Sequence, residues 1–361
     1  MPQRAKIRAR AEDLRQGFEA VGATRVETAV LQPAETLLDL YGEDIRGRAY
    51  VTSDALRGEQ MLRPDFTVPV VQMHMEHGAE PARYTYSGKV FRRQEDDDSR
   101  DNEYVQVGYE VFDRENPAAA DAEVFDLIRG AVNHLDLRCA TGDIGILKAA
   151  VQGLETTERR KAALLRHIWR PRRFRSLLDR FSGRVAVPAS RVALLAQDDP
   201  MDHGFADIGL RSQTEVAARI EALREDADAA PIAAGQVALL DQLLNVRETL
   251  PNALEHLRDI AVDMPAITEA VFCLEDRIRA LAARGIDVET LEFEASYGRS
   301  QMEYYDGFVF GFYAGARPDL PPVATGGRYD ALTRVLGQGR EIPAVGGVIR
   351  PGLLVLLEGA E

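Results

Sequence analysis

Residues 84–112 read YTYSGKVFRRQEDDDSRDNEYVQVGYEVF, and this stretch decides the fold. Both of its ends are rich in aromatic and β-branched side chains, which favour β-strands, and a polar segment separates them. The pattern therefore predicts two antiparallel strands joined by a long turn. Arg92 and Arg100 stand at the two ends of the turn. A guanidinium group of this kind can hold a phosphate or a carboxylate through paired hydrogen bonds.

The turn also carries a run of consecutive acids, Glu95–Asp98. At about 8 Å, each carboxylate would repel a phosphate charge by roughly 0.5 kcal/mol in water and by about 2 kcal/mol at an intermediate dielectric. The hairpin therefore has the form of a nucleotide-binding hairpin, but the negative charge of its turn no longer favours a nucleotide. The alternative interpretation is a solvated hairpin tip, where runs of charge are common.

Composition narrows the class of protein. A length of 361 residues predicts two or three packing units. The net charge of -14 and the pI of about 5.1 argue against a general nucleic-acid binder. A basic run at 159–175 has leucines at helical spacing, which favours a solvated helix face over an RNA-binding patch.

The same composition indicates the compartment. Cys139 and Cys273 are too few for a zinc site or a disulfide framework, which is typical of a reducing cytoplasm. The chain has neither a long apolar run that would cross a membrane nor an apolar signal segment at its start. We therefore expect a cytoplasmic protein with no membrane contact.

Apolar periodicity predicts the remaining elements. An amphipathic helix is expected at 3–22, with an apolar face made by Ile7, Ala11, Leu14, Phe18 and Val21. The other predictions are, in chain order, a strand at Pro33, a helix at 36–41, strand and turn at 50–53 and 61–67, helices at 68–77 and 118–135, a strand at 139–142, strands at 291–297 and 304–314, a turn at Gly326–Gly327, a strand at 345–349 and a last apolar helix. Residues 145–288 are almost wholly helical in pattern.

This order of elements predicts an α+β protein, with an antiparallel β-sheet flanked by helices and interrupted by a helical insertion. We expect the two parts of the core at 1–144 and 289–361, and the insertion at 145–288. We expect no further domain after the last helix.

Five segments, taken in order, carry a resemblance to a known family. They are LRPDFT at 62–67, the hairpin at 84–112, MEYYDGFVF at 302–310, GGRYD at 326–330 and PAVG at 343–346. Together they resemble the catalytic core of histidyl-tRNA synthetase, a class II aminoacyl-tRNA synthetase. The resemblance implies a class II synthetase-like core and, given the end of the chain, no anticodon-binding domain.

The resemblance implies a histidine-binding pocket made by Asp65, Thr67, Arg92, Gln106, Glu110, Tyr304 and Tyr305. Asp65, Thr67 and Gln106 would hold the α-amino group, although the family has the longer Glu where this chain has Asp65. Glu110 and Tyr305 would bracket the imidazole. A carboxylate and a phenol can satisfy the two ring nitrogens, while a second carboxylate pairs the ammonium. Each residue, taken alone, is also an ordinary strand or core residue.

The residues that would activate an amino acid depart from the family. Arg92 keeps the position that grips the α-phosphate, but Ser300 replaces the catalytic arginine, and the adjacent Arg299 would point to the other face. Leu353 stands where an ATP-binding arginine belongs, and we expect Pro351 to disturb the start of that helix. Stabilising an adenylyl transfer needs fixed cations, so the resemblance implies that adenylation and tRNA charging are lost.

Such losses are typical of one branch of the family, the regulatory subunits of ATP phosphoribosyltransferase. The resemblance implies a non-catalytic chain without a cofactor or metal and without tRNA. It would assemble with the short catalytic subunit into a hetero-octamer, activate it, and take part in feedback inhibition by L-histidine in the first step of histidine biosynthesis. We expect the loops at 65–67, 92–101 and 298–305 to order when histidine binds.

The resemblance also implies a self-dimer, because the helix at 3–22 and the strand at Pro33 resemble the family's dimer motif. The alternative is that their apolar residues face only the chain's own core. Two rival functions stay open. One is a truncated ligase that adenylates histidine or another amino acid, which the retained Arg92 and Arg100 favour. The other is a binding module on translation, against which the negative charge argues.

Overall fold

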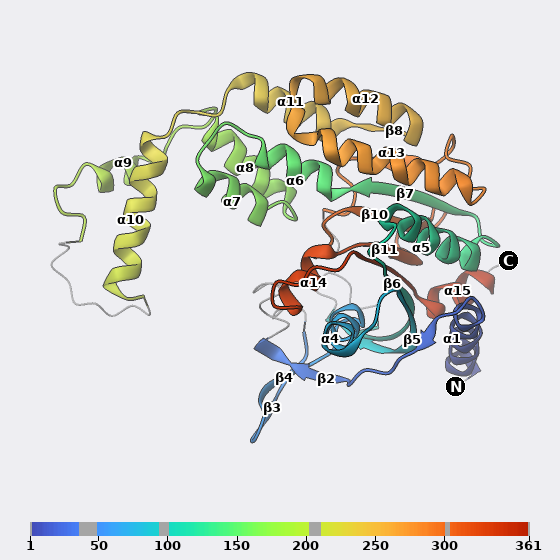
Figure 1. Ribbon diagram of the computed structural model, residues 1–361. Coiled ribbons are helices and arrows are strands. Elements are labelled where there is room, and N and C mark those ends of the chain that lie inside the picture. The colour runs from blue at the N-terminus through green and yellow to red at the C-terminus, as the bar shows by residue number, and fades with distance from the viewer. Residues whose placement is uncertain (1, 36–48, 94–100, 202–210, 300–303, 360–361) are drawn as a thin grey trace.

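The computed structural model describes residues 2–35, 49–93, 101–201, 211–299 and 304–359. Its largest element is a β-sheet (Figure 1). The strands of this main sheet are β1 (Thr24–Arg25), β5 (Ala82–Phe91), β6 (Glu103–Phe112), β7 (Leu137–Asp143), β8 (Arg247–Thr249), β9 (Glu292–Glu294), β10 (Phe308–Ala314), β11 (Ala324–Arg328) and β12 (Ala344–Ile349). They lie in the order β1-β5-β6-β12-β11-β10-β7-β9-β8. Most neighbours are antiparallel, as predicted, but β1 pairs with β5 and β7 pairs with β9 in parallel.

The hairpin of β5 and β6 confirms the central prediction from the sequence. The two strands pair antiparallel from Ala82↔Phe112 to Phe91↔Glu103. Successive side chains alternate between the two faces of the sheet, so the hairpin presents a different set of residues on each side. The turn that carries Glu95–Asp98 and Arg100 lies outside the described residues.

One face of the main sheet is covered by helix α5 (Pro117–Val132), which packs against β6, β11 and β12 (Figure 1). The start of α5 is encoded locally: the side chain of Asn116 accepts a hydrogen bond of 3.0 Å from the backbone N–H of Ala119, and Pro117 begins the helix. The predicted helix at 118–135 is thereby confirmed.

The N-terminal helix α1 (Pro2–Ala20) packs against β5, β6 and the last helix, α15 (Pro351–Glu358). Ala11, Leu14 and Phe18 are buried, as their spacing predicts. Val21 is 50% exposed because α1 ends one residue before it, so its predicted place on the apolar face is wrong. The apolar face of α1 thus packs against the chain's own core.

A small second sheet lies beside the main one. It consists of β2 (Leu31–Pro33), β3 (Val51–Asp54) and β4 (Gly58–Leu62), in the order β2-β4-β3. The strand predicted at Pro33 is confirmed, and its edge position suits a residue without a backbone N–H. Helix α4 (Thr67–His77) follows β4 and packs against α14 (Asp330–Leu336), while the helix predicted at 36–41 lies outside the described residues.

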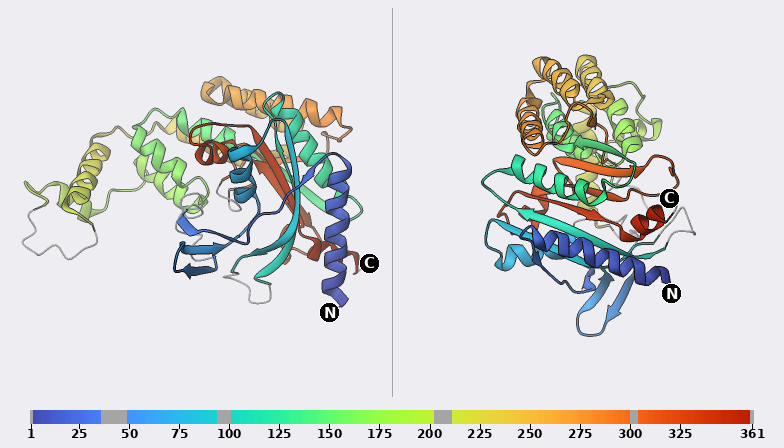
Figure 2. Two further views of the ribbon diagram at one scale, coloured as in Figure 1. Left: turned by 60° about the horizontal axis from the view of Figure 1, so that its bottom comes forward. Right: turned by 90° about the vertical axis from the view of Figure 1, so that its right-hand side faces the viewer.

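The segment predicted as helical begins with α6. Its helices are α6 (Ile144–Gln152), α7 (Glu158–Arg166), α8 (Pro171–Phe181), α9 (Ala189–Leu195), α10 (Gln213–Asp228), α11 (Ala234–Asn245), α12 (Leu250–Asp263), the short 3₁₀ helix η1 (Pro265–Ile267) and α13 (Thr268–Ala283). Helices α9 and α10 extend away from the sheet, whereas α13 packs against α5 (Figures 1 and 2). The segment is not wholly helical, because β8 joins the edge of the main sheet by pairing with β9. Among the described residues, no helix combines the length and the apolarity that crossing a membrane requires.

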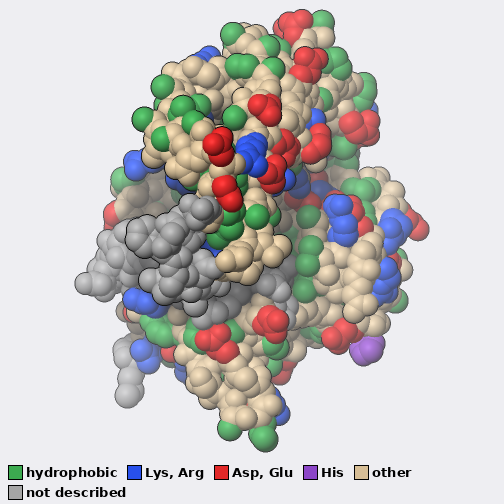
Figure 3. Space-filling view, turned by 90° about the vertical axis from the view of Figure 1, so that its left-hand side faces the viewer, with side chains coloured by type: hydrophobic (Ala, Val, Ile, Leu, Met, Phe, Trp, Pro, Cys, Tyr) green, Lys and Arg blue, Asp and Glu red, His purple; other side chains and the backbone are tan. Residues whose placement is uncertain are grey.

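Acidic side chains pair with the basic run at 159–175. The pairs include Arg159–Glu225, Arg160–Asp226 and Arg175–Asp241. Cationic and anionic side chains are also interspersed on the face of the molecule drawn in Figure 3. These pairs favour the predicted charged helix surface over a site for the phosphates of RNA, because these three arginines already have anionic partners.

Two local predictions about glycine and proline are wrong. Gly326 and Gly327 form no turn: they lie within β11 and pair with Gly347 and Gly346 of β12. A Cβ atom on Gly327 would lie 2.7 Å from the ring of Tyr305, so this strand needs glycine for close packing. Pro351 does not disturb its helix either, because it stands in the first turn of α15, where its missing N–H costs nothing.

Candidate functional site

A cavity of about 140 Å³ lies at one face of the main sheet. Its described lining is Asp65, Thr67, Arg92, Gln106, Tyr304, Tyr305, Pro322, Thr325, Val348 and Arg350. The lining residues of β6, β11 and β12 lie on the opposite face from α5, because residues of alternate parity, such as Gly347, meet α5 instead. All the residues predicted for the histidine pocket line this cavity except Glu110.

Asp65 and Thr67 reach the cavity from the start of α4. The carboxylate of Asp65 is 2% exposed and accepts from the backbone N–H of Val68 at 3.4 Å. The preceding loop is held by Arg63, whose guanidinium lies 3.9 Å from the centre of the Phe66 ring and donates to the carbonyl of Lys89 at 2.9 Å. Asp65 is therefore a fixed anion at the edge of the cavity.

Arg92 brings a cation to the same place. Its side chain lies 3.7 Å from the carboxylate of Asp65, and its Nε donates to the carbonyl of Pro64 at 2.7 Å. These contacts orient the guanidinium at the end of β5. The cavity thus presents an anion and a cation next to each other, as binding an amino-acid zwitterion requires.

Gln106 projects from β6 and is 2% exposed. Its side-chain carbonyl, as the amide is oriented here, has no hydrogen-bond partner among the described residues. A buried acceptor without a partner carries a free-energy penalty, which a bound donor would relieve. Gln106 can therefore accept a hydrogen bond from an ammonium group.

Tyr304 and Tyr305 form the aromatic part of the lining. Both are buried, and their ring centres lie 4.9 Å apart at an angle of 63°. Burial raises the pKa of Tyr305, so its hydroxyl stays protonated at neutral pH and can donate a hydrogen bond. Ser300 and residues 301–303, which precede them, lie outside the described residues.

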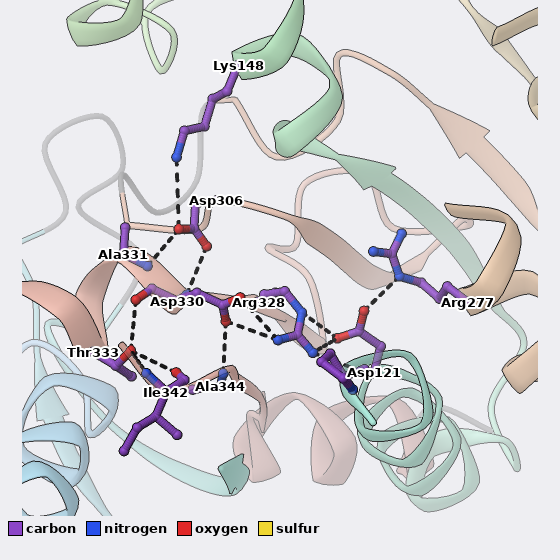
Figure 4. Close-up of polar contacts among 11 residues, drawn as sticks. Asp121, Lys148, Arg277, Asp306, Arg328, Asp330, Ala331, Thr333, Ile342 and Ala344 are labelled. Carbon is purple, nitrogen blue, oxygen red and sulfur yellow. Dashed lines mark hydrogen bonds and ion pairs between the residues drawn. The ribbon is translucent and has the colours of Figure 1, made fainter. Parts of the chain in front are cut away.

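Asp306 directly follows Tyr305 in the chain, and its side chain is held by several polar contacts (Figure 4). Its carboxylate accepts from the backbone N–H groups of Asp330 and Ala331, at 2.9 and 2.6 Å, and lies 3.9 Å from Nζ of Lys148. Asp306 therefore ties the segment beside the cavity to the start of α14 and to α6.

A buried ion network continues from this point to α13 (Figure 4). Arg328 lies between Asp330, at 3.0 Å, and Asp121 of α5, at 2.7 Å. Asp121 also pairs with Arg277 of α13 at 2.8 Å, and Arg277 reaches Asp143 at the same distance. The network connects the cavity side of the core to the helical segment through charges that are all paired.

Glu110 lies behind the cavity lining. Its carboxylate is 1% exposed and accepts from Thr67 at 3.1 Å, Tyr86 at 2.8 Å and Tyr329 at 2.5 Å. Burial raises the pKa of Glu110 to about 7, although the hydrogen bonds from the three hydroxyls oppose this rise. In this arrangement Glu110 positions Thr67, and its direct contact with an imidazole stays a prediction.

Arg299 and Leu353, which the sequence also singled out, do not belong to the described lining of the cavity. Nε of Arg299 donates to the carbonyl of Ile168 at 2.8 Å, and its guanidinium lies over the ring of Phe174, so this side chain faces the helical segment. Leu353 packs against the core. No group of three or more His, Cys, Asp or Glu side chains in the described ranges could hold a metal ion.

Sequence reasoning missed Arg350, together with Pro322, Thr325 and Val348. Arg350 follows Val348 by two positions, which is the strand period, so alternation along β12 would have placed it on the same face. The sequence alone does not show that this face of β12 and Asp65 border the same cavity.

Comparison with known proteins identifies the fold and the family. Residues 1–198 and 212–351 match the family model described as histidyl-tRNA synthetase. The chain is 31% identical to the ATP phosphoribosyltransferase regulatory subunit of Brucella anthropi, with 96% of each chain covered. It is 33% identical to the subunit of the same name from Agrobacterium fabrum, with 93% of each chain covered.

Solved structures agree on the fold. A Bacillus halodurans protein described as an ATP phosphoribosyltransferase regulatory subunit/histidyl-tRNA synthetase superposes with a TM-score of 0.67 at 20% identity, covering 98% of this chain and 79% of that one. The histidyl-tRNA synthetase of Nostoc gives a TM-score of 0.63 at 18% identity, covering 99% and 73%.

The fold and the cavity therefore define a histidyl-tRNA synthetase-like protein with a class II core. Within that class, the chain belongs to the family of ATP phosphoribosyltransferase regulatory subunits. The resemblance in the sequence is confirmed, as is the predicted regulatory, non-catalytic role.

Proposed function

We propose that this chain binds L-histidine in the cavity and transmits feedback inhibition to the short catalytic subunit of ATP phosphoribosyltransferase, which it also activates. The observation that carries the proposal is the convergence of Asp65, Arg92, Gln106 and Tyr305 on one cavity in a chain of this family. The complex is a hetero-octamer in this proposal. It acts in the cytoplasm, which the free Cys139 and Cys273 favour.

The charges of the lining suit a zwitterion. Asp65 and the side-chain carbonyl of Gln106 are acceptors for the ammonium group, and Arg92 is a donor for the carboxylate. The protonated hydroxyl of Tyr305 can donate to an imidazole nitrogen. The ammonium, the carboxylate and one imidazole nitrogen of the amino acid thus each have a partner.

The size of the cavity favours a single small ring over a nucleotide. A volume of about 140 Å³ is close to that of the roughly 150 Å³ engineered cavity that takes up benzene, whereas clefts for larger ligands span about 300–1,000 Å³. A side chain of one five-membered ring suits this space. Leu353, in place of the ATP-binding arginine of the family, supports the same choice.

Regulation requires that histidine bind one conformation of the complex more tightly than another. A coupling of about 1–3 kcal/mol changes affinity by roughly 5–150-fold. The network from Asp306 through Arg328 to Arg277 offers a packed connection from the cavity to α13.

Calorimetric titration of the chain with L-histidine, and in parallel with ATP, tests the proposed ligand. Binding of histidine without ATP supports the sensor, whereas binding of neither by the chain or by its complex with the catalytic subunit contradicts it. A Tyr305→Phe chain, assembled with the catalytic subunit, should lose sensitivity to histidine while still activating that subunit. Unchanged inhibition by histidine would exclude this cavity as the regulatory site.

A second candidate is the truncated ligase, which Arg92 at the cavity favours. It predicts ATP–pyrophosphate exchange in the presence of an amino acid. Exchange at a rate well above that of an Arg92→Ala chain would support the ligase, and its absence would leave the sensor.

The proposal includes a self-dimer and no tRNA. Because α1 packs against the chain's own core, the dimer contact is proposed at β2 and β3, where Leu31 is 47% and Val51 39% exposed. Light scattering should give twice the mass of the chain, and a Leu31→Asp/Val51→Asp chain should give the mass of a monomer. A monomer for the unchanged chain at micromolar concentration would contradict this part.

A further inference from the structure

Arg350 lines the cavity from the end of β12. We propose that Arg350 determines specificity for the α-carboxylate of the amino acid, which its guanidinium binds together with that of Arg92. This inference rests on the proposed function and adds to it a residue that the sequence motifs do not point to.

The backbone holds Arg350 firmly at this place. Its N–H donates to the carbonyl of Val323 at 2.9 Å, and its own carbonyl accepts from Leu353 at 3.0 Å and from Leu354 at 3.3 Å. The first of these bonds continues the pairing of β12 with β11, and the other two begin α15. Arg350 is therefore fixed where the sheet ends and the helix starts.

The direction of the side chain follows from the strand. Gly346 faces the carboxylate of Glu110, which a Cβ atom at that position would overlap at 1.4 Å. Val348 and Arg350 follow on the same face at the strand period and line the cavity. The guanidinium of Arg350 lies 5.5 Å from the centre of the Tyr104 ring, which belongs to the same face of β6 as Gln106. A contact of this kind limits where a long side chain can point.

The chemistry of the lining indicates the bound group. Its described charged residues are two arginines, Arg92 and Arg350, and one acid, Asp65. Arg92 is oriented partly by Asp65 and Pro64, so only some of its donors can serve a ligand. The planar guanidinium of Arg350, which comes from the end of β12 on the other side of β6 from β5, presents N–H donors in the geometry that a carboxylate accepts. A ligand with both an ammonium and a carboxylate therefore fits better than an amine alone.

The test compares two ligands that differ at the carboxylate. L-Histidinol keeps the ammonium and the imidazole of L-histidine but has an alcohol in place of the carboxylate. The full chain is titrated calorimetrically with each ligand, and so are the Arg350→Gln and Arg350→Lys chains. Arg317→Gln serves as a control, because Arg317 is exposed, pairs with Asp319 at 2.6 Å and does not belong to the described lining.

Arg350→Gln should weaken L-histidine binding by roughly 10–100-fold, since hydrogen bonds to charged groups are worth about 1.5–3 kcal/mol. It should change L-histidinol binding less than about threefold, Arg350→Lys should restore part of the loss, and Arg317→Gln should change neither ligand. Equal loss for both ligands, or no loss, would overturn the role of Arg350 and leave the proposed function intact. Failure of both the unchanged chain and its complex with the catalytic subunit to bind histidine would overturn both.

Discussion

The hydroxyl of Tyr329 donates to Oε2 of Glu110 across 2.5 Å, joining the start of α14 to the C-terminal part of β6. Both groups are buried, and Thr67 and Tyr86 donate to the other carboxylate oxygen of Glu110. Through these three hydroxyl donors, the buried carboxyl group of Glu110 connects α4, the start of α14 and the hairpin next to the cavity. Its protonation state therefore affects the stability of the fold as well as the position of Thr67.

We predict that Glu110 makes the fold less stable as pH rises from about 5 to about 7. Burial raises its pKa to about 7, above the ordinary 4.5, so in this interval the folded chain binds more protons than the unfolded chain. The free energy of unfolding then falls with pH, by up to about 3 kcal/mol in total. Glu110→Gln mimics the protonated group and should flatten this dependence in urea unfolding measured across the interval.

Glu115→Gln is the matched control, because Glu115 is exposed just beyond β6. The control should keep the slope of the unchanged chain. If the curves of the unchanged chain and Glu110→Gln run parallel from about pH 5 to 7, Glu110 does not titrate in this range and the assignment is wrong.

Two glycines should respond in opposite ways to alanine. A Cβ atom on Gly346 would lie 1.4 Å from the carboxylate of Glu110, so Gly346→Ala should destabilise the fold by about 3 kcal/mol or prevent folding. Gly130 is exposed on α5 with nothing within 4 Å of such an atom, so Gly130→Ala should stabilise by about 0.5–1 kcal/mol. Thermal unfolding of both chains measures the difference, and a stable Gly346→Ala chain would contradict the packing.

The sequence predicted those parts of the fold whose pattern is long and periodic. The hairpin and α5 were predictable because alternating or helical apolar residues run through them, and because Asn116 and Pro117 mark a helix start. The strand β8 has three residues, which is too short for any period to appear. Gly326 and Gly327 suggest a turn by composition, and only the ring of Tyr305 beside them explains why glycine stands in a strand.

The residues that line the cavity were also predictable only in part. Asp65, Thr67 and Gln106 were predictable because motifs carry them. Arg350 was not, because its place depends on β12 lying next to β6, a contact between segments far apart in the chain. The role of the lining in binding histidine remains a prediction, which the variants address.

The ion network gives a prediction about the attachment of α13. Arg277 is buried and pairs with Asp121 and Asp143, so Arg277→Met would leave two buried carboxylates short of a partner. Removing one partner of such a pair costs about 3–5 kcal/mol. Arg279→Met on the same helix removes an exposed cation that pairs with Glu275 and Asp276 within the helix, and should stay within about 0.5 kcal/mol.

Urea unfolding of the two chains measures both free energies. Equal stability of Arg277→Met and Arg279→Met would mean that the network does not hold α13 to the core.

Asp65 should decide whether the cavity distinguishes an amino acid from an acid without the amino group. The buried carboxylate of Asp65 is the acidic group in the described lining, so Asp65→Asn removes the proposed ionic partner of the ammonium. We expect L-histidine to bind roughly 10–100-fold more weakly, from the loss of about 1.5–3 kcal/mol. Imidazolepropionate, which lacks the ammonium, should bind Asp65→Asn at least as well as the unchanged chain, because the ligand no longer faces an anion.

Asp113→Asn is the control for a general effect of removing a carboxylate. Asp113 lies 3.7 Å from Arg83, the same separation as between Asp65 and Arg92, but it stands at the end of β6 and does not belong to the described lining. Its variant should bind both ligands like the unchanged chain. If Asp65→Asn weakens L-histidine and imidazolepropionate equally, Asp65 supports the shape of the cavity through Arg92 and does not contact the ammonium. The ammonium would then be held by Gln106 and Thr67, and a Gln106→Leu chain should show the selective loss instead.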